Sequence, residues 1–244
     1  MLPTVLPYVQ AAPPSEATIV FRDTFLALYS HNMTHSCHLT PDIVQTTQDK
    51  GGLAVMADKT RCSWAGEAPM FQDYHDYEWG RPVHDDQRLF EMLILEGAQA
   101  GLSWITVLKK RDAYRVAFDG FDPNKVALYD EAKIEKLMSN EGIIRNRLKI
   151  KAAITNARLF LDIQKQYGSF ERFIWQYVDY KPIVGHWERI EDAPATTPLS
   201  DRISKDLKKL GFKFVGSTII YAFMQATGMA NDHTIDCFVY DQLK

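Results

Sequence analysis

The 244-residue sequence lacks the features of three large classes of protein. Its 3 cysteines are too few and too unevenly spread for a disulfide framework. Its longest candidate for a membrane helix, residues 17–29, is short of the roughly 20 residues required and is interrupted by Arg22 and Asp23. No positively charged segment precedes an apolar core at the N-terminus, so no signal peptide is predicted. With 46% hydrophobic and 24% charged residues, the composition excludes a disordered polymer and favours a cytoplasmic globular protein with no membrane partner.

Sequence composition divides the chain near residue 56. Residues 1–55 are rich in proline and show no sustained helical period, which predicts a poorly structured N-terminal extension. Met56 is an alternative natural start, and N-terminal sequencing would test it. We interpret one polar cluster in this extension as a chance run, since no second ligand pair lies nearby. Its members are His31, His35, Cys37 and His38.

Helical periodicity with recognisable caps runs through residues 56–244 and predicts a single all-α domain. We expect the last helix to be capped by Asn231 or Asp232, and residues 181–198 to form an exposed loop. The other predicted helices run from Asp85 or Asp86 to Gly101, from Trp104 to about Phe118, from Asp130 to before Gly142, from about Arg145 to Tyr167 with Leu148 facing inward, from Ser169 through Tyr177, from Ser200 to Gly211, and from Thr218 to Thr227.

Two cysteines and two histidines at opposite ends of this domain are candidate metal ligands. Cys62 precedes His75, and His233 and Cys237 have the i, i+4 spacing that places both side chains on one helix face. Two thiolates and two imidazoles would complete a tetrahedral zinc site and leave no position for water, so the ion would be structural. The alternative is two buried thiols and two unrelated histidines, and the spacing leaves both interpretations open.

Glu96 falls on the apolar stripe of its predicted helix, together with Leu89 and Leu93. A carboxylate is costly to bury unless it is paired or hydrogen-bonded. Small residues follow it, so a flat ligand could approach closely, and aromatic residues lie nearby in sequence. The site could therefore hold a base with an amino group, or Glu96 could form a salt bridge with an arginine or lysine in the core.

A third pattern is a helix that ends at Gly211, a short turn through Gly216 and the start of another helix. Backbone N–H groups at such a helix start can bind phosphate. Lys208, Lys209 and Lys213 surround the turn, and a second basic run holds Arg145, Arg147, Lys149 and Lys151. Such runs are either solvated helix faces or contacts to a nucleic-acid backbone.

These segments together resemble the 3-methyladenine DNA glycosylase I family of helix-hairpin-helix glycosylases. The resemblance lies in residues 61–64, 74–80, 95–104, 211–216 and 231–233, and extends from about residue 59 to the C-terminus. It implies a helix-hairpin-helix glycosylase fold in which Cys62, His75, His233 and Cys237 hold one structural zinc that joins the two ends of the domain. It also implies a monomer that binds double-stranded alkylated DNA, with backbone contacts from Gly211, Lys213, Gly216, Lys208 and Lys209.

The same resemblance assigns the base site. Glu96 and Tyr74 would hydrogen-bond a flipped base, on which Trp104 would stack. Family members often carry tyrosine where this chain has Phe71, so one hydroxyl contact is missing. Trp79, Trp64 and Phe71 would complete the aromatic surroundings. Because 3-methyladenine in DNA is a cation, a negative Glu96 and indole faces would favour it over adenine.

The implied reaction is hydrolytic release of 3-methyladenine, which leaves an abasic site in base excision repair. Ser217 and Thr218 stand where strand-cleaving relatives have a lysine, so a monofunctional enzyme is predicted. Asp232 lies where several relatives place a catalytic aspartate, but we interpret it as a cap of the helix that carries His233. The competing functions are a zinc-stapled DNA-binding module and a zinc hydrolase.

Overall fold

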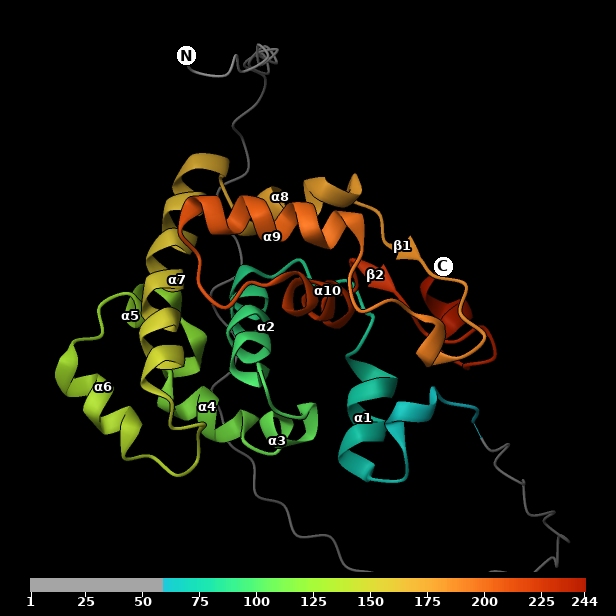
Figure 1. Cartoon of the computed structure of the whole chain (residues 1–244), viewed down its shortest axis with the longest axis horizontal. Helices are drawn as coiled ribbons and strands as arrows, with labels where there is room; N and C mark the ends of the chain where they lie inside the picture. Colours follow the sequence, from blue (N-terminus) through green and yellow to red (C-terminus); the bar gives the residue numbers. More distant parts are fainter. Residues whose placement is uncertain (1–58) are drawn as a thin grey trace, which may run out of the picture. The chain divides into compact units, whose positions relative to one another are not determined.

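A computed structural model describes residues 59–244. The N-terminal extension, residues 1–55, and its histidine and cysteine cluster lie outside the described residues. The described chain is built mainly from helices, as predicted (Figure 1). They are α1 Pro69–Tyr77, α2 Asp86–Gln99, α3 Trp104–Leu108, α4 Arg111–Ala117, α5 Pro123–Val126, α6 Glu131–Met138, α7 Arg147–Tyr167, α8 Phe170–Trp175, α9 Pro198–Leu210 and α10 Ser217–Ala226, with short 3-10 turns at η1 Ser63–Ala65, η2 Asp119–Phe121, η3 Gln176–Val178, η4 Ile190–Asp192 and η5 Tyr240–Leu243. No helix in this part is long and apolar enough to span a membrane.

The predicted helix starts follow from local capping. The carboxylates of Asp85 and Asp130 and the hydroxyl of Ser169 each accept a hydrogen bond from a backbone N–H in the first turn of their helix. Helix α9 begins at Pro198, two residues earlier than predicted, because Thr197 and Ser200 form a reciprocal capping box.

Two helix predictions need correction. The helix predicted from Trp104 to Phe118 is divided at Lys109 and Lys110 into α3 and α4. The division lets α4 present Arg111 to a buried glutamate of α2, Glu91, at 2.8 Å. Leu148 does not face inward, since its side chain is 72% exposed.

The segment after α8 is more ordered than the predicted loop, and the predicted last helix is absent from the described residues. β1, Ile183–Val184, pairs in parallel with β2, Ala230–Asn231. A bridge between Trp187 and Thr234 continues the pairing, and the N–H of Phe238 donates to the carbonyl of Thr60. These hydrogen bonds hold residues 232–239 in extended and turn conformations and exclude a helix there.

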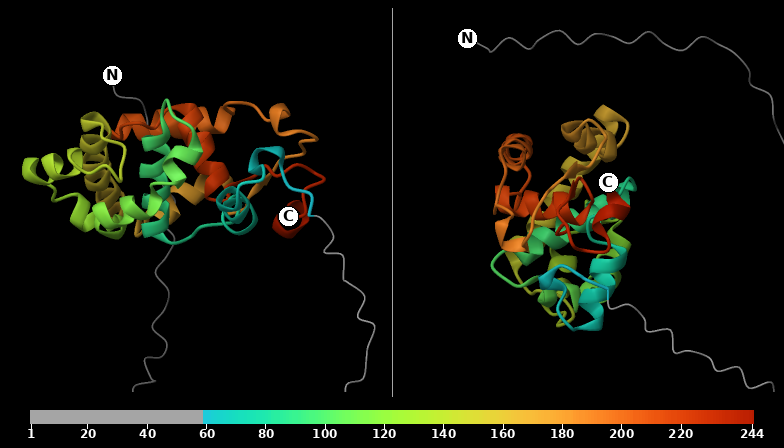
Figure 2. Two further views of the ribbon diagram at one scale, coloured as in Figure 1. Left: turned by 90° about the horizontal axis from the view of Figure 1, so that it is seen from below. Right: turned by 90° about the vertical axis from the view of Figure 1, so that its right-hand side faces the viewer.

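Helix α2 lies at the centre of the described unit and contacts α3, α7, α8 and α10 (Figure 1). It is buried continuously from Leu89 to Ala98, so it is surrounded by the core rather than half-exposed. Both views in Figure 2 place the segment around α1 beside the C-terminal residues. Segments near the two ends of the described chain therefore lie side by side.

Candidate active site

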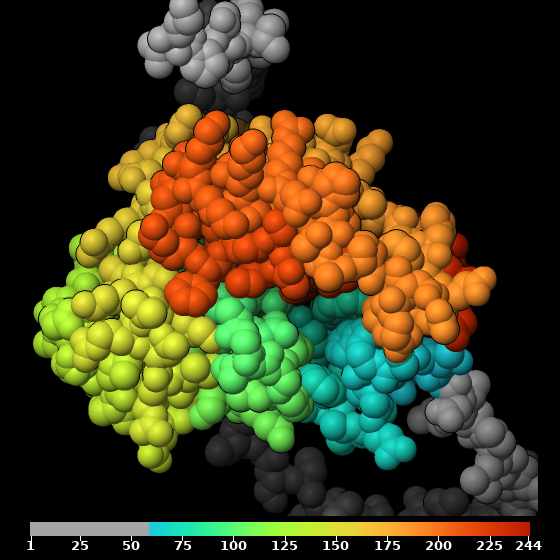
Figure 3. All heavy atoms as spheres, viewed as in Figure 1, coloured from blue at the N-terminus to red at the C-terminus, as the bar shows by residue number. Residues whose placement is uncertain are grey.

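A cavity of about 490 Å³ opens where α1, α2, α3 and α10 meet the segment after β1. Figure 3 shows the surface hollowed between the teal N-terminal segment, the green α2–α3 region and the orange residues near 190. The cavity contains all six residues that the sequence assigned to catalysis and base binding. Its lining is Trp64, Phe71, Tyr74, Trp79, Glu96, Gln99, Trp104, Ile190, Ala193, Pro194, Ala222 and Gln225.

Glu96 reaches this cavity from α2 and is only 4% exposed. Within residues 59–244 its carboxyl group makes no hydrogen bond and no ion pair. Burial raises the pKa of Glu96 from 4.5 to about 8. Burial therefore favours the neutral carboxyl near neutral pH, whereas the sequence led us to expect a negative charge.

This pKa shift predicts a pH-dependent stability difference between the wild type and Glu96→Gln. The folded state holds the Glu96 proton more tightly than the unfolded state, so this contribution to stability is complete below pH 4.5 and is lost as pH rises through about 8. From pH 5 to pH 9 the free energy of unfolding of the wild type should fall, relative to the variant, by up to about 4 kcal/mol. Urea unfolding of both proteins at both pH values measures this, and parallel pH profiles would contradict it.

The salt-bridged glutamate of α2 is Glu91, not Glu96. Its carboxylate accepts hydrogen bonds from Arg88, Arg111 and Arg115 at 2.8–3.0 Å. These arginines, with Arg111 first, lower the pKa of Glu91 against the opposing effect of burial. The pKa values of the two buried glutamates on α2 therefore shift in opposite directions, because only Glu91 lies within reach of the arginines of α4.

The aromatic residues form a continuous wall around Glu96. Ring centroids lie 5.3 Å apart for Tyr74 and Trp104, and 5.0 Å apart for Trp64 and Trp79. Phe71 packs edge-on against Trp64 at 5.9 Å. The indole N–H groups of Trp64 and Trp104 are buried without a hydrogen-bond partner in the described chain, and burial raises the pKa of Tyr74. The wall therefore combines flat apolar faces with unused donors.

The cavity is also lined by residues that were not predicted from the sequence. Two of them, Gln99 and Gln225, are polar. The contacts of Gln225 are the more informative. Its amide nitrogen donates to Asp232 at 2.9 Å. Asp232 also accepts from Tyr221 at 2.6 Å and from Trp187 at 2.7 Å. The helix-capping role predicted for Asp232 is wrong, because no helix begins there and its carboxylate instead binds Gln225 and Tyr221 of α10 and Trp187. No periodicity identified Gln225, since α10 is apolar around it.

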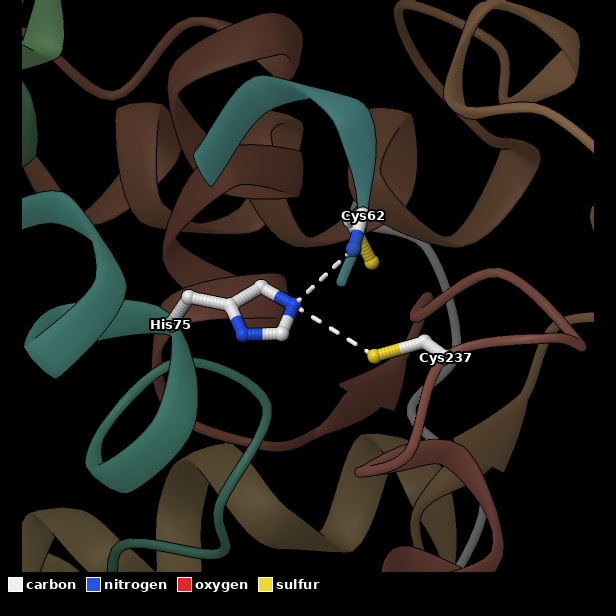
Figure 4. A group of neighbouring side chains, drawn as sticks. All are labelled: Cys62, His75 and Cys237. Carbon is white, nitrogen blue, oxygen red and sulfur yellow. Dashed lines mark hydrogen bonds between the residues drawn. The ribbon is translucent and has the colours of Figure 1, made fainter. Parts of the chain in front are cut away.

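Three of the four predicted metal ligands meet away from the cavity opening. Ligand atoms of Cys62, His75 and Cys237 lie within 4.8 Å of one another, and all three residues are buried (Figure 4). The Cys237 sulfur is 3.4 Å from His75 Nε2. The thiol hydrogen bond between the cysteines lowers the pKa of Cys237 and raises that of Cys62. His233 is outside this group of three, although its ring centroid is 5.0 Å from that of His75.

The prediction that His233 and Cys237 share a helix face is wrong, since both lie in the extended and turn segment after β2. Each histidine has its Nδ1 atom occupied: His75 by Asp76 at 2.8 Å and His233 by Asn231 at 3.0 Å. The Nε2 atom of His233 is buried without a hydrogen-bond partner in the described residues. A hydrogen bond at Nδ1 that fixes the ring is typical of histidines that bind a metal through Nε2.

The turn between α9 and α10 leaves several polar groups exposed. Gly211 ends α9 in the left-handed region at φ 104°, and Gly216 precedes α10 without a side-chain cap. Lys208, Lys209 and Lys213 are exposed and form no ion pair within residues 59–244.

The second basic run differs, because its members are already bound. Lys149 donates to the carbonyls of Ala98 and Ala100. The other three pair with acidic side chains: Arg145 with Glu141, Arg147 with Glu131 and Glu135, and Lys151 with Glu131. This run is a paired helix face, so the turn after α9 remains the candidate backbone contact.

Comparison with known proteins adds independent information. The family described as methyladenine glycosylase matches residues 64–240. The chain is 51% identical over 180 residues to DNA-3-methyladenine glycosylase 1 of Escherichia coli (strain K12), covering 74% of this chain and 96% of that protein. It is 50% identical over 178 residues to DNA-3-methyladenine glycosylase of Haemophilus influenzae, covering 73% and 96%.

A solved structure shares the fold. It concerns the structural basis of 3-methyladenine recognition by 3-methyladenine DNA glycosylase I from Staphylococcus aureus. Its TM-score is 0.72 at 39% sequence identity, and the match covers 74% of this chain and 96% of that one.

Proposed function

This chain belongs to the methyladenine glycosylase family, and from that membership we infer that it is a monofunctional DNA glycosylase that releases 3-methyladenine from alkylated DNA. The main structural support for this function is the position of Glu96. Its carboxyl group is buried in an aromatic cavity and has no partner in the described chain. A DNA-binding module would gain nothing from a polar group held so unfavourably.

We propose that the cavity receives the flipped base, with Trp104 stacking on it and Glu96 and Tyr74 as its hydrogen-bond partners. Trp64, Trp79 and Phe71 surround it, and each cation–π contact contributes about 0.5–2 kcal/mol. Gln225, whose amide nitrogen donates to Asp232, lines the same cavity and would add a polar contact to the base. A cationic base favours the ionised form of Glu96, so its binding lowers the raised pKa and releases a proton.

The reaction needs little help to protonate the leaving group. Methylation at N3 makes the purine a cation that leaves as a neutral base, so the glycosidic bond is already weak. Extrusion of the nucleotide costs a few kcal/mol, which contacts to the cavity and the DNA backbone must offset. Water then attacks the sugar at C1′, and an abasic site remains.

We propose that α9, the turn at residues 211–216 and α10 form a helix-hairpin-helix contact to double-stranded DNA. Backbone N–H groups at the start of α10 have no partner in the described chain and would bind a phosphate. Gly211 and Gly216 shape the turn, and Lys208, Lys209 and Lys213 add positive charge without competing ion pairs. The protein would act on cytoplasmic DNA as a monomer.

A monofunctional mechanism predicts base release without strand cleavage. Ser217 and Thr218 follow the hairpin, and neither can form a Schiff base with the sugar as a lysine does. Incubation with a labelled methylated duplex should leave the strand intact until alkali is added. Nicking without alkali, or covalent trapping by borohydride, would contradict this prediction.

We propose that Cys62, His75, His233 and Cys237 hold a structural zinc ion. The residues fit such an ion: two buried thiols, two imidazoles anchored at Nδ1, and a His233 Nε2 atom with no partner in the described chain. Zinc would supply a cross-link between segments far apart in sequence rather than a reactive water. A zinc hydrolase is not favoured, because the cluster is fully buried beside the cavity wall rather than open within it.

The direct test is incubation of the protein with DNA treated with a methylating agent, followed by chromatographic identification of the released bases. Release of 3-methyladenine is expected, with untreated DNA as the control. Binding of the duplex without release would support a binding module instead.

A further inference from the structure

One buried polar side chain on α7, Asn156, has no contact with the base cavity but binds the hairpin directly. Its amide nitrogen donates to the carbonyl of Lys213 at 2.9 Å, and its amide oxygen accepts from the N–H of Lys213 at 2.8 Å. Asn156 is only 3% exposed. Both backbone groups of one hairpin residue are thus held from a helix 57 positions away in sequence.

A second buried side chain holds the hairpin from its other side. The hydroxyl of Ser204, on α9, donates to the carbonyl of Val215 at 2.7 Å and is 1% exposed. Between these two anchors lies Phe214, whose φ of 54° is in the left-handed region. That conformation costs a non-glycine residue free energy and persists only where surrounding contacts impose it. The two anchors therefore determine the course of the hairpin.

The same hairpin rests on the helix that carries Glu96. A Cβ atom on Gly97 would lie 3.3 Å from the Cβ of Phe214 and 3.5 Å from its carbonyl oxygen, so α2 and the hairpin are in close contact. Helix α7 also holds the end of α2, because Lys149 donates to the carbonyls of Ala98 and Ala100 at 2.7 Å. Lys149 and Asn156 are seven residues apart, and thus on one face of α7. In Figure 1 the hairpin passes beside α7 on its way to α10.

We propose that Asn156 is a positioning residue for base release, because it holds the hairpin at a fixed distance from Glu96. When the hairpin binds the DNA phosphate, this distance places the flipped base in the cavity. The inference rests on the proposed function, since it requires the hairpin to bind DNA. Small displacements of a substrate from its reactive position have large effects on rate. An amide suits the task because it offers both a donor and an acceptor to the backbone of a single residue.

The test compares Asn156→Ala and Asn156→Asp with the wild type. Affinity for a duplex with a tetrahydrofuran abasic analogue, and kcat/KM on methylated duplex, should each fall about tenfold. Affinity for 3-methyladenine, followed by tryptophan fluorescence, should stay within twofold, because no cavity contact changes. Asn156→Asp should be the more severe variant, since its carboxylate would face the carbonyl of Lys213.

Asn146→Ala is the matched control. Asn146 lies at the start of the same helix, where its side chain accepts from the N–H of Lys149, so its loss reduces stability without touching the hairpin. Ser204→Ala, which removes the other anchor, should weaken duplex binding in the same way and carries the test if the Asn156 variants fail to fold.

Unchanged duplex affinity in the Asn156 variants would overturn the proposal. Equal losses for the duplex and for 3-methyladenine would also overturn it, since they indicate general destabilisation. Failure of the proposed function can be distinguished from failure of this proposal. A wild type that releases no base would contradict the proposed function before any variant is made. The comparison of duplex affinities would still decide whether Asn156 positions the hairpin.

Discussion

Replacing Glu96 by glutamine is expected to reduce the release of 3-methyladenine about 100-fold. Glutamine keeps the shape of the protonated carboxyl but cannot ionise when a cationic base enters the cavity. The lost charge-assisted hydrogen bond is worth about 1.5–3 kcal/mol, which corresponds to about 10- to 100-fold in rate, and the charge itself contributes in the same direction. Single-turnover release from methylated duplex measures the change.

Zinc content and affinity for an undamaged duplex should be unchanged in Glu96→Gln, because the proposed metal ligands and the hairpin are untouched. Glu141→Gln is the matched control, since the Glu141 side chain is 84% exposed and pairs only with Arg145 in the described chain. If release survives in Glu96→Gln at the wild-type rate, the role assigned to Glu96 is wrong.

Replacing Cys237 by serine is expected to remove the bound zinc and to lower the free energy of unfolding by about 4 kcal/mol, the stabilisation given by a ligand at about 1,000 times its Kd. For a domain of this size, that corresponds to a fall in Tm of about 10 °C. The reason is that the proposed zinc would join the segment before α1 to the segment after β2. Elemental analysis and thermal unfolding measure the two effects.

The third cysteine supplies the control. Cys37 lies outside the described residues, and Cys37→Ser should retain both zinc and thermal stability. A chelator should lower the Tm of the wild type to that of Cys237→Ser and leave the variant unaffected. Wild-type protein that contains no zinc, or a variant with an unchanged Tm, would contradict the metal assignment.

The helix predictions succeeded where the deciding interactions are local. Asp85, Asp130 and Ser169 cap their helices by accepting hydrogen bonds from N–H groups three residues later, so each capping pair lies within a short stretch of sequence. The prediction for His233 and Cys237 failed because an i, i+4 spacing fits a tight turn as well as a helix. The turn is favoured over the helix because the backbone carbonyls of Trp187 and Thr60, which are distant in sequence, accept hydrogen bonds from this segment.

Glu91 and Glu96 show the same limit within one helix. Periodicity identified Glu96 as a buried carboxyl, but left open whether it faced an arginine or a cavity. The answer depends on α4, whose Arg111 and Arg115 reach Glu91 and not Glu96.

The helical class, most helix starts, the family and the residues that line the cavity could be predicted from the chain alone, because each depends on neighbouring residues or on long shared motifs. The surroundings of Glu96, the partners of Asp232, the pairing of the second basic run and the contact of Asn156 with the hairpin became evident only from the folded chain. The physical reason is that solvation and hydrogen-bond partners depend on which distant segments meet, and no local pattern in the chain records that.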